Sequence, residues 1–411
     1  MKSHKFLLIV LFLAIPVFVA GCKYKVTEPL WNQPYTTPPS PTITSIDPPS
    51  EAKAGVNTIT IHGHNLVVSV PDTLTPDSTV VYFGSVAATI INADSSSIVV
   101  NRPNTTGTDT IKVVPHNAIS VATYGPYTVD AVVEQYGGFL QNLQLGAIAV
   151  DNSENLYVME SIKKLVHKVT PDGNNVVLGG GTLATSFQPF DASIGPDGNL
   201  YVTENNRSID SINVGAETRA RWVQMPSGKV VRFGDFDTGG HFYTGGVRTD
   251  LCILPPNPST SSSGVKFAGS YATDEILAIR VYGGYVYVAS QPYGTQDPAT
   301  IWRNQILSDG VGPREKVLDM SATQFGAVPI TGLAFSSTGT MVIATHSQYP
   351  LLMVDQSSGA VTEVYRGIIP AYGGGIAWSK SSTYLYLITG DTDTGQTWTV
   401  YRVDMGITGG K

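Results

Sequence analysis

The chain has 411 residues, a formal net charge of −7 and only 14% charged residues, and it is rich in Gly (42), Pro (26) and Tyr (20). Its acidic character excludes the electrostatic attraction by which basic proteins bind nucleic acid. Low charge combined with many turn-forming residues is typical of all-β proteins and disfavours long helices. The length fits two domains, one of them large.

Residues 1–21 have the features of an export signal. Lys2 and Lys5 precede an apolar run, 6–19, which leads to small residues at 20–21. A basic start, an apolar core and a small-residue cleavage site form a secretory signal. The alternative is a membrane-spanning helix, but the run is shorter than the about 20 residues that cross a bilayer, and Pro16 interrupts it.

The end of this segment, Val19-Ala20-Gly21-Cys22, resembles the lipobox of bacterial lipoproteins. The resemblance implies cleavage before Cys22 and lipidation of that cysteine, so the mature protein would be anchored in the outer membrane, on the cell surface or the periplasmic face. An ordinary signal peptide is the alternative. The only other cysteine, Cys252, would then have no intramolecular partner, and its apolar surroundings predict a buried residue.

Residues 22–40 are predicted to be a tether, because their prolines hold a chain extended. Alternating segments follow over 41–130, for example Thr58–Ile61, Val80–Phe83 and Thr110–Val114, and turn-forming residues separate them. Short alternating strands at this spacing predict a β-sandwich.

Residues 41–130 resemble the IPT/TIG family of immunoglobulin-like domains. The resemblance depends on Pro41-x-Ile43-x-x-Ile46-x-Pro48, Ile59-Thr60-Ile61-x-Gly63-x-Asn65-Leu66, Phe83-Gly84, Ile98-x-Val100-x-x-Pro103 and Ile111-x-Val113. It implies an immunoglobulin-like sandwich that serves as a spacer or interaction module.

Residues 131–411 contain a repeated phrase. Phe190–Val202 shows it most fully, as an apolar strand, a Pro-Asp-Gly-Asn turn and a Leu-Tyr-Val strand. Five copies are clear, and a weaker sixth fits between Phe236 and Tyr271. A four-stranded unit recurring about every 45 residues predicts the blades of a propeller. Because the last copy lacks an outer strand, Ala131–Tyr136 could supply it and close the ring.

The phrase Pro196-Asp197-Gly198-Asn199-Leu200-Tyr201-Val202 resembles the repeats of NHL-type and gluconolactonase-like six-bladed propellers. NHL repeats usually carry Asp after the second strand, whereas this chain has Glu160, Glu204, Ser290, Thr345 and Thr389 there. The complete prediction is an all-β protein, with an N-terminal immunoglobulin-like sandwich and a C-terminal six-bladed β-propeller.

Polar residues at the ends of two second strands form the first candidate site. Glu160 and Glu204 are expected near one mouth of the channel on adjacent blades, with Asn206 close by. Such oxygens can line a polar pocket or hold Ca²⁺ or another divalent cation, which in lactonase-like propellers would polarise a carbonyl. Ordinary loop residues that bond between blades are the alternative, and we assign no metal, cofactor or catalytic residue.

Loop aromatics form the second candidate site. Tyr293, Tyr349 and Tyr372, together with His346, follow strands in the second half of the propeller. Aromatic rings in loops can stack on sugar rings or anchor a protein partner, although tyrosines also pack between blades. We therefore predict a membrane-anchored propeller that binds a glycan or protein ligand, with a metal-dependent lactonase or lyase as the alternative.

Overall fold

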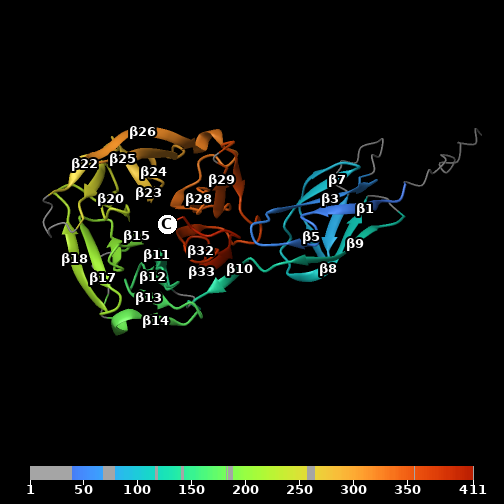
Figure 1. Ribbon diagram of the computed structural model, residues 1–411, viewed down its shortest axis with the longest axis horizontal. Helices are drawn as coiled ribbons and strands as arrows, with labels where there is room; N and C mark the ends of the chain where they lie inside the picture. Colours follow the sequence, from blue (N-terminus) through green and yellow to red (C-terminus); the bar gives the residue numbers. More distant parts are fainter. Residues whose placement is uncertain are drawn as a thin grey trace, which may run out of the picture.

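The computed structural model describes residues 39–67, 79–115, 119–139, 143–181, 183, 188–256, 264–355 and 357–410. The predicted signal peptide, Cys22 and nearly all of the tether lie outside these residues. Figure 1 shows a small sandwich beside a ring of sheets. The described helices are the 3₁₀ turns Leu178–Gly181 and Met320–Ala322, and no described helix is long and apolar enough to span a membrane.

The N-terminal domain is a sandwich of two sheets, which agrees with the prediction. One sheet has the order β1 (Thr42–Asp47), β3 (Thr58–His64), β7 (Ser97–Asn101), β6 (Ile90–Ala93). The other has the order β2 (Glu51–Ala52), β9 (Ala122–Val129), β8 (Gly107–Val114), β4 (Val80–Phe83), β5 (Val86–Ala88). Alternate residues such as Ile59, Ile61 and Ile98 are fully buried between the sheets, because successive side chains of a strand point to opposite faces.

The C-terminal domain contains six four-stranded antiparallel sheets, the blades of a propeller. Blade 1 consists of β11 (Leu145–Val150), β12 (Leu156–Glu160), β13 (Val166–Val169) and β14 (Asn175–Val177). Blade 2 consists of β15 (Asp191–Ile194), β16 (Leu200–Thr203), β17 (Ser208–Asn213) and β18 (Thr218–Gln224). Blade 3 consists of β19 (Phe233–Phe236), β20 (Phe242–Gly245), β21 (Leu251–Leu254) and β22 (Lys266–Ala268). Blade 4 consists of β23 (Asp274–Tyr282), β24 (Tyr285–Pro292), β25 (Thr300–Leu307) and β26 (Gly310–Asp319). Blade 5 consists of β27 (Ile330–Phe335), β28 (Met341–Thr345), β29 (Leu351–Val354) and β30 (Val361–Glu363). Blade 6 consists of β31 (Gly373–Trp378), β32 (Tyr384–Asp391), β33 (Gln396–Asp404) and β10 (Val133–Tyr136).

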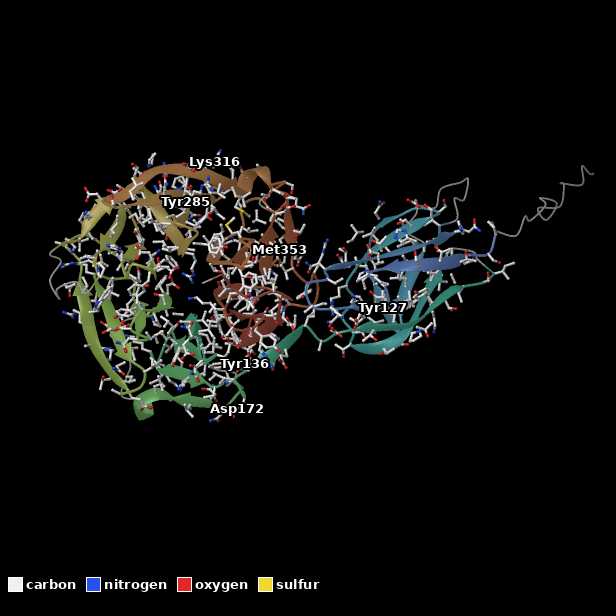
Figure 2. All side chains as sticks on the ribbon, in the orientation of Figure 1. Tyr127, Tyr136, Asp172, Tyr285, Lys316 and Met353 are labelled. Carbon is white, nitrogen blue, oxygen red and sulfur yellow. The ribbon has the colours of Figure 1, made fainter. Side chains whose placement is uncertain are left out.

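The ring closes through strand β10, as the sequence predicted for Ala131–Tyr136. Val133 pairs with Val403 and Tyr136 pairs with Val400 in an antiparallel ladder. The final blade thus combines a strand from the start of the domain with three from its end, so opening the ring requires this ladder to separate. Tyr136 marks the closing strand in Figure 2.

In the first three blades, the tyrosine near the start of the second strand of the repeated phrase is hydrogen-bonded to an aspartate in the turn before it. The Tyr201 hydroxyl donates to Asp197 Oδ2 at 2.9 Å, across the turn that joins the two inner strands of blade 2. The equivalent pairs are Tyr157 with Asp151 at 3.0 Å and Tyr243 with Asp237 at 3.2 Å. Burial and the adjacent aspartate raise the pKa of each tyrosine. The aspartate therefore orders its turn and satisfies a partly buried hydroxyl.

The first strands of the blades, β11, β15, β19, β23, β27 and β31, adjoin one another around the channel. Each starts opposite the end of its second strand, as Leu145 pairs with Glu160 and Asp191 pairs with Thr203. The ring therefore has two faces. We call the face near Glu160 and Glu204 the rim face, and the opposite face, with the Asp151 and Asp197 turns, the turn face.

The sandwich is held against blades 5 and 6 by buried polar contacts. The Tyr365 hydroxyl accepts from the Gly55 N–H at 2.6 Å and donates to the Asp404 carbonyl at 2.6 Å. The Tyr365 N–H donates to Asn57 Oδ1 at 2.9 Å. Arg102, only 2% exposed, lies over the Tyr365 ring. These contacts couple the orientations of the two domains.

Candidate functional site

Glu160 lies on the rim face as predicted, but its side chain serves its own blade. Glu160 Oε1 is 2.9 Å from His167 Nε2, and His167 Nδ1 is 3.0 Å from Asn175 Oδ1. Glu160 and His167 are both buried. The chain of contacts runs from the second to the fourth strand of blade 1, so the structure places this carboxylate within the blade.

Glu204 follows β16 at the same face and is 1% exposed. Asn206 Nδ2 donates to Glu204 Oε2 at 3.3 Å. Burial raises the pKa of Glu204 to about 7, and the neighbouring carboxylate of Asp210, with which Glu204 shares a hydrogen bond, adds to the shift. Asp210 in turn lies 3.3 Å from Arg219 Nε. Glu204 and Asn206 thus come together, but within blade 2 and apart from the contacts of Glu160.

The remaining predicted residues also lie at the rim face. Tyr293 is 50% exposed and lies under the Arg248 guanidinium, while the Tyr349 ring packs edge-on against Phe325. His346 and Tyr372 come together from blades 5 and 6, with ring centroids 5.3 Å apart, and His346 Nε2 is 3.7 Å from Asp391 Oδ1. The structure therefore joins two of these four residues and gives Tyr293 and Tyr349 separate partners.

The described residues include no group of three His, Cys, Asp or Glu side chains placed to hold a metal ion. Glu160 and Glu204, which a cation would have to join, make their contacts in different blades. The possible site for Ca²⁺ or another divalent cation at Glu160 and Glu204 is therefore not supported by a converging pair of carboxylates, and ligand binding at the seven predicted positions stays a prediction.

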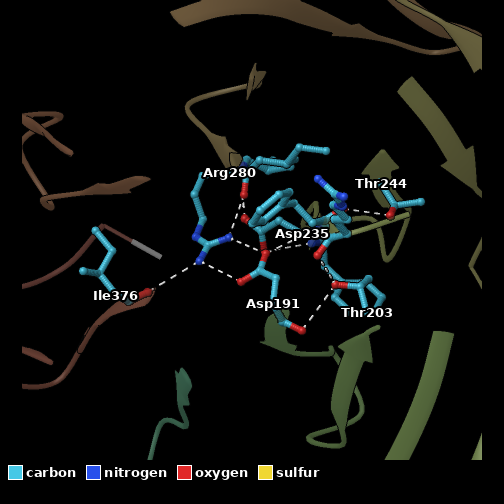
Figure 3. A network of polar contacts seen from close by, with 12 residues as sticks. Asp191, Thr203, Asp235, Thr244, Arg280 and Ile376 are labelled. Atoms are coloured by element: carbon cyan, nitrogen blue, oxygen red, sulfur yellow. Dashed lines mark hydrogen bonds and ion pairs between the residues drawn. The ribbon is translucent and has the colours of Figure 1, made fainter. Parts of the chain in front are cut away.

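The channel contains a charged cluster that the sequence analysis did not identify. Arg280, on the first strand of blade 4, reaches Asp191 of blade 2 with two contacts, Nη1 to Oδ2 at 2.9 Å and Nη2 to Oδ1 at 3.2 Å (Figure 3). Nη1 also donates to the Ile279 carbonyl at 2.7 Å, and Nη2 lies 3.5 Å from the Ile376 carbonyl of blade 6. One side chain therefore links three blades across the channel.

Asp191 and Asp235 are fixed by backbone donors. Gly234 N–H donates to Asp191 Oδ2 at 3.2 Å, and Val281 N–H donates to Asp235 Oδ2 at 2.8 Å. Although burial opposes its charge, the nearby Asp191 and Asp235 raise the pKa of Arg280. Charge-assisted bidentate pairs are strong and geometrically specific, so the cluster holds blades 2, 3 and 4 together.

A cavity of about 570 Å³ opens beside this cluster, and all six blades contribute to its wall. Ala149, Ser193, Asp235, Arg280, Ala334 and Ala377 occupy equivalent positions on the six first strands. The turn residues Asp151–Ser153, Gly195–Pro196 and Asp237–Thr238 also line the cavity. Since these are the turns between first and second strands, the cavity belongs to the turn face.

The sequence contains a signal for this cluster. Arg280 is a lone charge in the apolar strand Ile276–Val281, and Asp191 lies in an inner strand at the position where the copy in blade 1 has Ala147. Charged residues are rarely buried unless they are paired. A search for charges inside inner strands would have identified both residues, but their pairing across blades depends on the closure of the ring.

Comparison with known proteins supports both domains. Residues 41–129 match the family model described as IPT/TIG domain. No curated protein matches the chain.

Among solved structures, an auxiliary nutrient binding protein from Bacteroides ovatus is similar at 13% identity and TM-score 0.51, covering 90% of this chain and 99% of that one. An auxiliary nutrient binding protein from Bacteroides thetaiotaomicron is similar at 11% identity and TM-score 0.52, covering 88% and 98%. A gluconolactonase from Xanthomonas campestris is similar at 14% identity and TM-score 0.50, covering 68% and 90%.

The fold therefore defines a two-domain protein with an IPT/TIG immunoglobulin-like domain followed by a six-bladed β-propeller. Because the sequence identities to these solved structures are so low, the similarity is evidence for a shared fold alone.

Proposed function

We propose that this protein is an extracytoplasmic lipoprotein, anchored through Cys22, whose propeller binds a glycan while the IPT/TIG domain acts as a spacer. The proposal combines the lipobox-like Val19–Cys22, the proline-rich segment before residue 41 and the architecture of the two domains. The similar Bacteroides structures described as auxiliary nutrient binding proteins favour a role in capture at the cell surface.

The observation that carries the proposal is the cavity at the channel. Its volume of about 570 Å³ lies in the range of small-molecule sites, which are concave, mostly apolar and provided with a few fixed polar groups. Phe236, Tyr282 and Phe335 supply aromatic surface, and Arg280 and Asp235 supply polar groups fixed by other contacts. A rigid, mixed wall of this kind suits a sugar, which presents both apolar faces and hydroxyls.

The sandwich supports the role of a spacer. It contacts the propeller at blades 5 and 6 through Tyr365, Asn57 and Gly55. The joint lies beside the ring (Figure 1), and none of the described residues that line the channel cavity belongs to the sandwich. The lactonase or lyase alternative required Glu160 and Glu204 to converge, and their separate contacts do not favour it.

The test is binding of the mature soluble chain, residues 23–411, to immobilised neutral and acidic polysaccharides in affinity gels, followed by calorimetry with oligosaccharides of the retained polymers. Saturable binding of at least one glycan is expected. Retention of no polysaccharide, together with no calorimetric signal from their oligosaccharides, would overturn the glycan assignment, and a lactone-hydrolysis assay lost on chelation would favour the enzyme instead.

A further inference from the structure

We propose that the ligand is held in the channel cavity of the turn face, and that it is an uncharged saccharide unit rather than an acidic one. This inference rests on the proposed function, for which the channel cavity was the main observation, and adds the face from which the ligand enters and the charge of the ligand. The seven residues predicted from the sequence lie at the rim face, so the two locations can be tested separately.

The cavity has a fixed floor. The Arg280 side chain crosses from blade 4 to Asp191 in blade 2 and approaches the Ile376 carbonyl of blade 6 (Figure 3). An ion pair spanning the channel blocks passage at this depth, so a ligand entering from the turn face meets a closed end. Because both partners are already satisfied, the floor is preorganised and binding does not require it to rearrange.

The wall contains polar groups without a partner. Ser193 is 9% exposed, lines the cavity and has a hydroxyl that bonds to no described residue. The indole N–H of Trp378, another residue of the wall, is likewise buried with no partner among the described residues. An unsatisfied buried polar group is costly, and a ligand hydroxyl can both donate and accept a hydrogen bond. Both atoms lie beneath the cavity surface with no accessible area of their own. The Ser193 hydroxyl reaches the cavity by rotation about its χ1 bond, so we assign it, and not the Trp378 indole, to contact with a polyhydroxylated ligand.

Aromatic rings form one side of the wall. Tyr282 and Phe335 are stacked, with centroids 4.8 Å apart and an interplanar angle of 6°. The backbone of 408–410 passes beside them, with Gly410 N–H donating to the Phe335 carbonyl at 2.8 Å. A side chain at Gly410 would overlap Tyr282 and the Ser336 carbonyl. This backbone contact fixes the position of the rings, and Tyr282, which is half-buried, remains available for contact with a ligand.

The charges around the cavity disfavour an anion. The wall carries the carboxylates Asp151, Asp235 and Asp237 against the cations Arg280 and Lys380, and Arg280 is already paired with Asp191. Asp235 is buried and Asp151 and Asp237 are partly buried, whereas Lys380 is exposed. The three carboxylates repel a further negative charge, which would also lose its hydration without gaining an unpaired cation on the floor. Uronic acids and sulfated sugars should therefore bind less tightly than neutral sugars.

The experiment uses the mature chain and calorimetric titration with neutral gluco-, xylo- and manno-oligosaccharides of two to four units and with oligogalacturonate. Ala377→Trp fills the cavity from a half-buried position on its wall. Ala87→Trp makes the same change at an exposed position of the sandwich and is the matched control. Tyr293→Ala tests the rim face, and thermal unfolding verifies that each variant is folded.

If the inference is correct, Ala377→Trp weakens binding of the neutral oligosaccharide at least about tenfold, while Ala87→Trp and Tyr293→Ala change it less than about twofold. Ser193→Ala lowers affinity by a few fold without lowering stability, because its hydroxyl has no partner in the free protein. If Ala377→Trp should be unfolded, the affinity of Ser193→Ala decides the location.

Three other results are distinguishable. Binding that survives Ala377→Trp but is lost in Tyr293→Ala would move the site to the rim face and overturn the inference while leaving the proposed function intact. Oligogalacturonate binding as tightly as the neutral sugars would overturn the assignment of charge. Absence of binding by every oligosaccharide to the folded wild-type chain would overturn the proposed function, and the inference with it.

Discussion

Arg280 and Asp191 form a bidentate ion pair across the propeller channel, although 89 positions separate them in the chain. The side chains are only 16% and 9% exposed. Inside a protein such a pair depends on both partners, because removing one leaves the other charged and desolvated. The contact therefore makes the first strands of blades 2 and 4 interdependent.

Replacing Asp191 should destabilise the propeller strongly. Asp191→Ala leaves Arg280 without its carboxylate, and we expect the free energy of unfolding to fall by about 3–5 kcal/mol in urea titrations. The double variant Asp191→Leu, Arg280→Met should recover most of this loss, because apolar pairs often replace buried ion pairs well. Glu315→Ala, which breaks the exposed pair with Arg303, is the control and should cost less than about 1 kcal/mol. A loss for Asp191→Ala no larger than that of the control would show that the channel pair is not structural.

The free energy of unfolding should fall as the pH rises toward neutrality, because the buried carboxyl group of Glu204 loses its proton at a higher pH than in the unfolded chain. Its pKa is raised to about 7 in the folded protein, from 4.5, so the folded chain retains a proton that the unfolded chain has lost. The stabilisation is complete below about pH 4.5 and is lost progressively up to about pH 7, amounting to roughly 1–2 kcal/mol after allowance for solvent screening.

Urea titrations between pH 5 and pH 8 measure this dependence. Glu204→Gln, which keeps a neutral hydrogen-bond donor beside Asp210, should flatten the decline and be more stable than the wild type at pH 8. Glu51→Gln removes one partner of the exposed ion pair between Glu51 and Lys53. It is the control and should leave the pH dependence of the unfolding free energy unchanged. An unaltered decline in Glu204→Gln would assign it to other groups.

The joint between the domains should loosen when the Tyr365 hydroxyl is removed. Tyr365→Phe leaves the Gly55 N–H and the Asp404 carbonyl without this partner, which should cost about 1–3 kcal/mol. It should also increase proteolysis between the domains, near residues 130–132. Tyr349→Phe is the control, since the Tyr349 hydroxyl bonds to no residue that the structure describes. Equal proteolysis of the two variants would argue against a joint held by Tyr365.

Membrane attachment should depend on Cys22. In cells, Cys22→Ser should move the protein from the membrane fraction to the soluble exported fraction, because the thiol that would carry lipid is absent. Cys252→Ser is the control, since this buried cysteine, whose pKa burial raises to about 12, is unreactive in the fold. Retention of Cys22→Ser in the membrane fraction would contradict the lipoprotein assignment.

Much of the fold was predictable because it depends on local patterns. The alternation in Thr58–Ile61 and the Asp-Tyr turns such as Asp197 with Tyr201 are set by neighbouring residues. The closing strand Val133–Tyr136 was predictable because the last repeat lacks a strand. The same patterns placed Glu160 and Glu204 at one face, but they could not give the direction of side chains, which His167 and Asp210 determine.

The sequence by itself determined the two β domains, their order and the repeat that forms six blades, because strand periodicity and turn chemistry act over a few residues. Only the tertiary structure decided which charges share the channel and which face is hollow. Closure of the ring brings Asp191 of blade 2 into contact with Arg280 of blade 4, and Asp235 of blade 3 into contact with the adjacent Val281 N–H. Contacts between residues so far apart in the chain depend on the geometry of the whole ring.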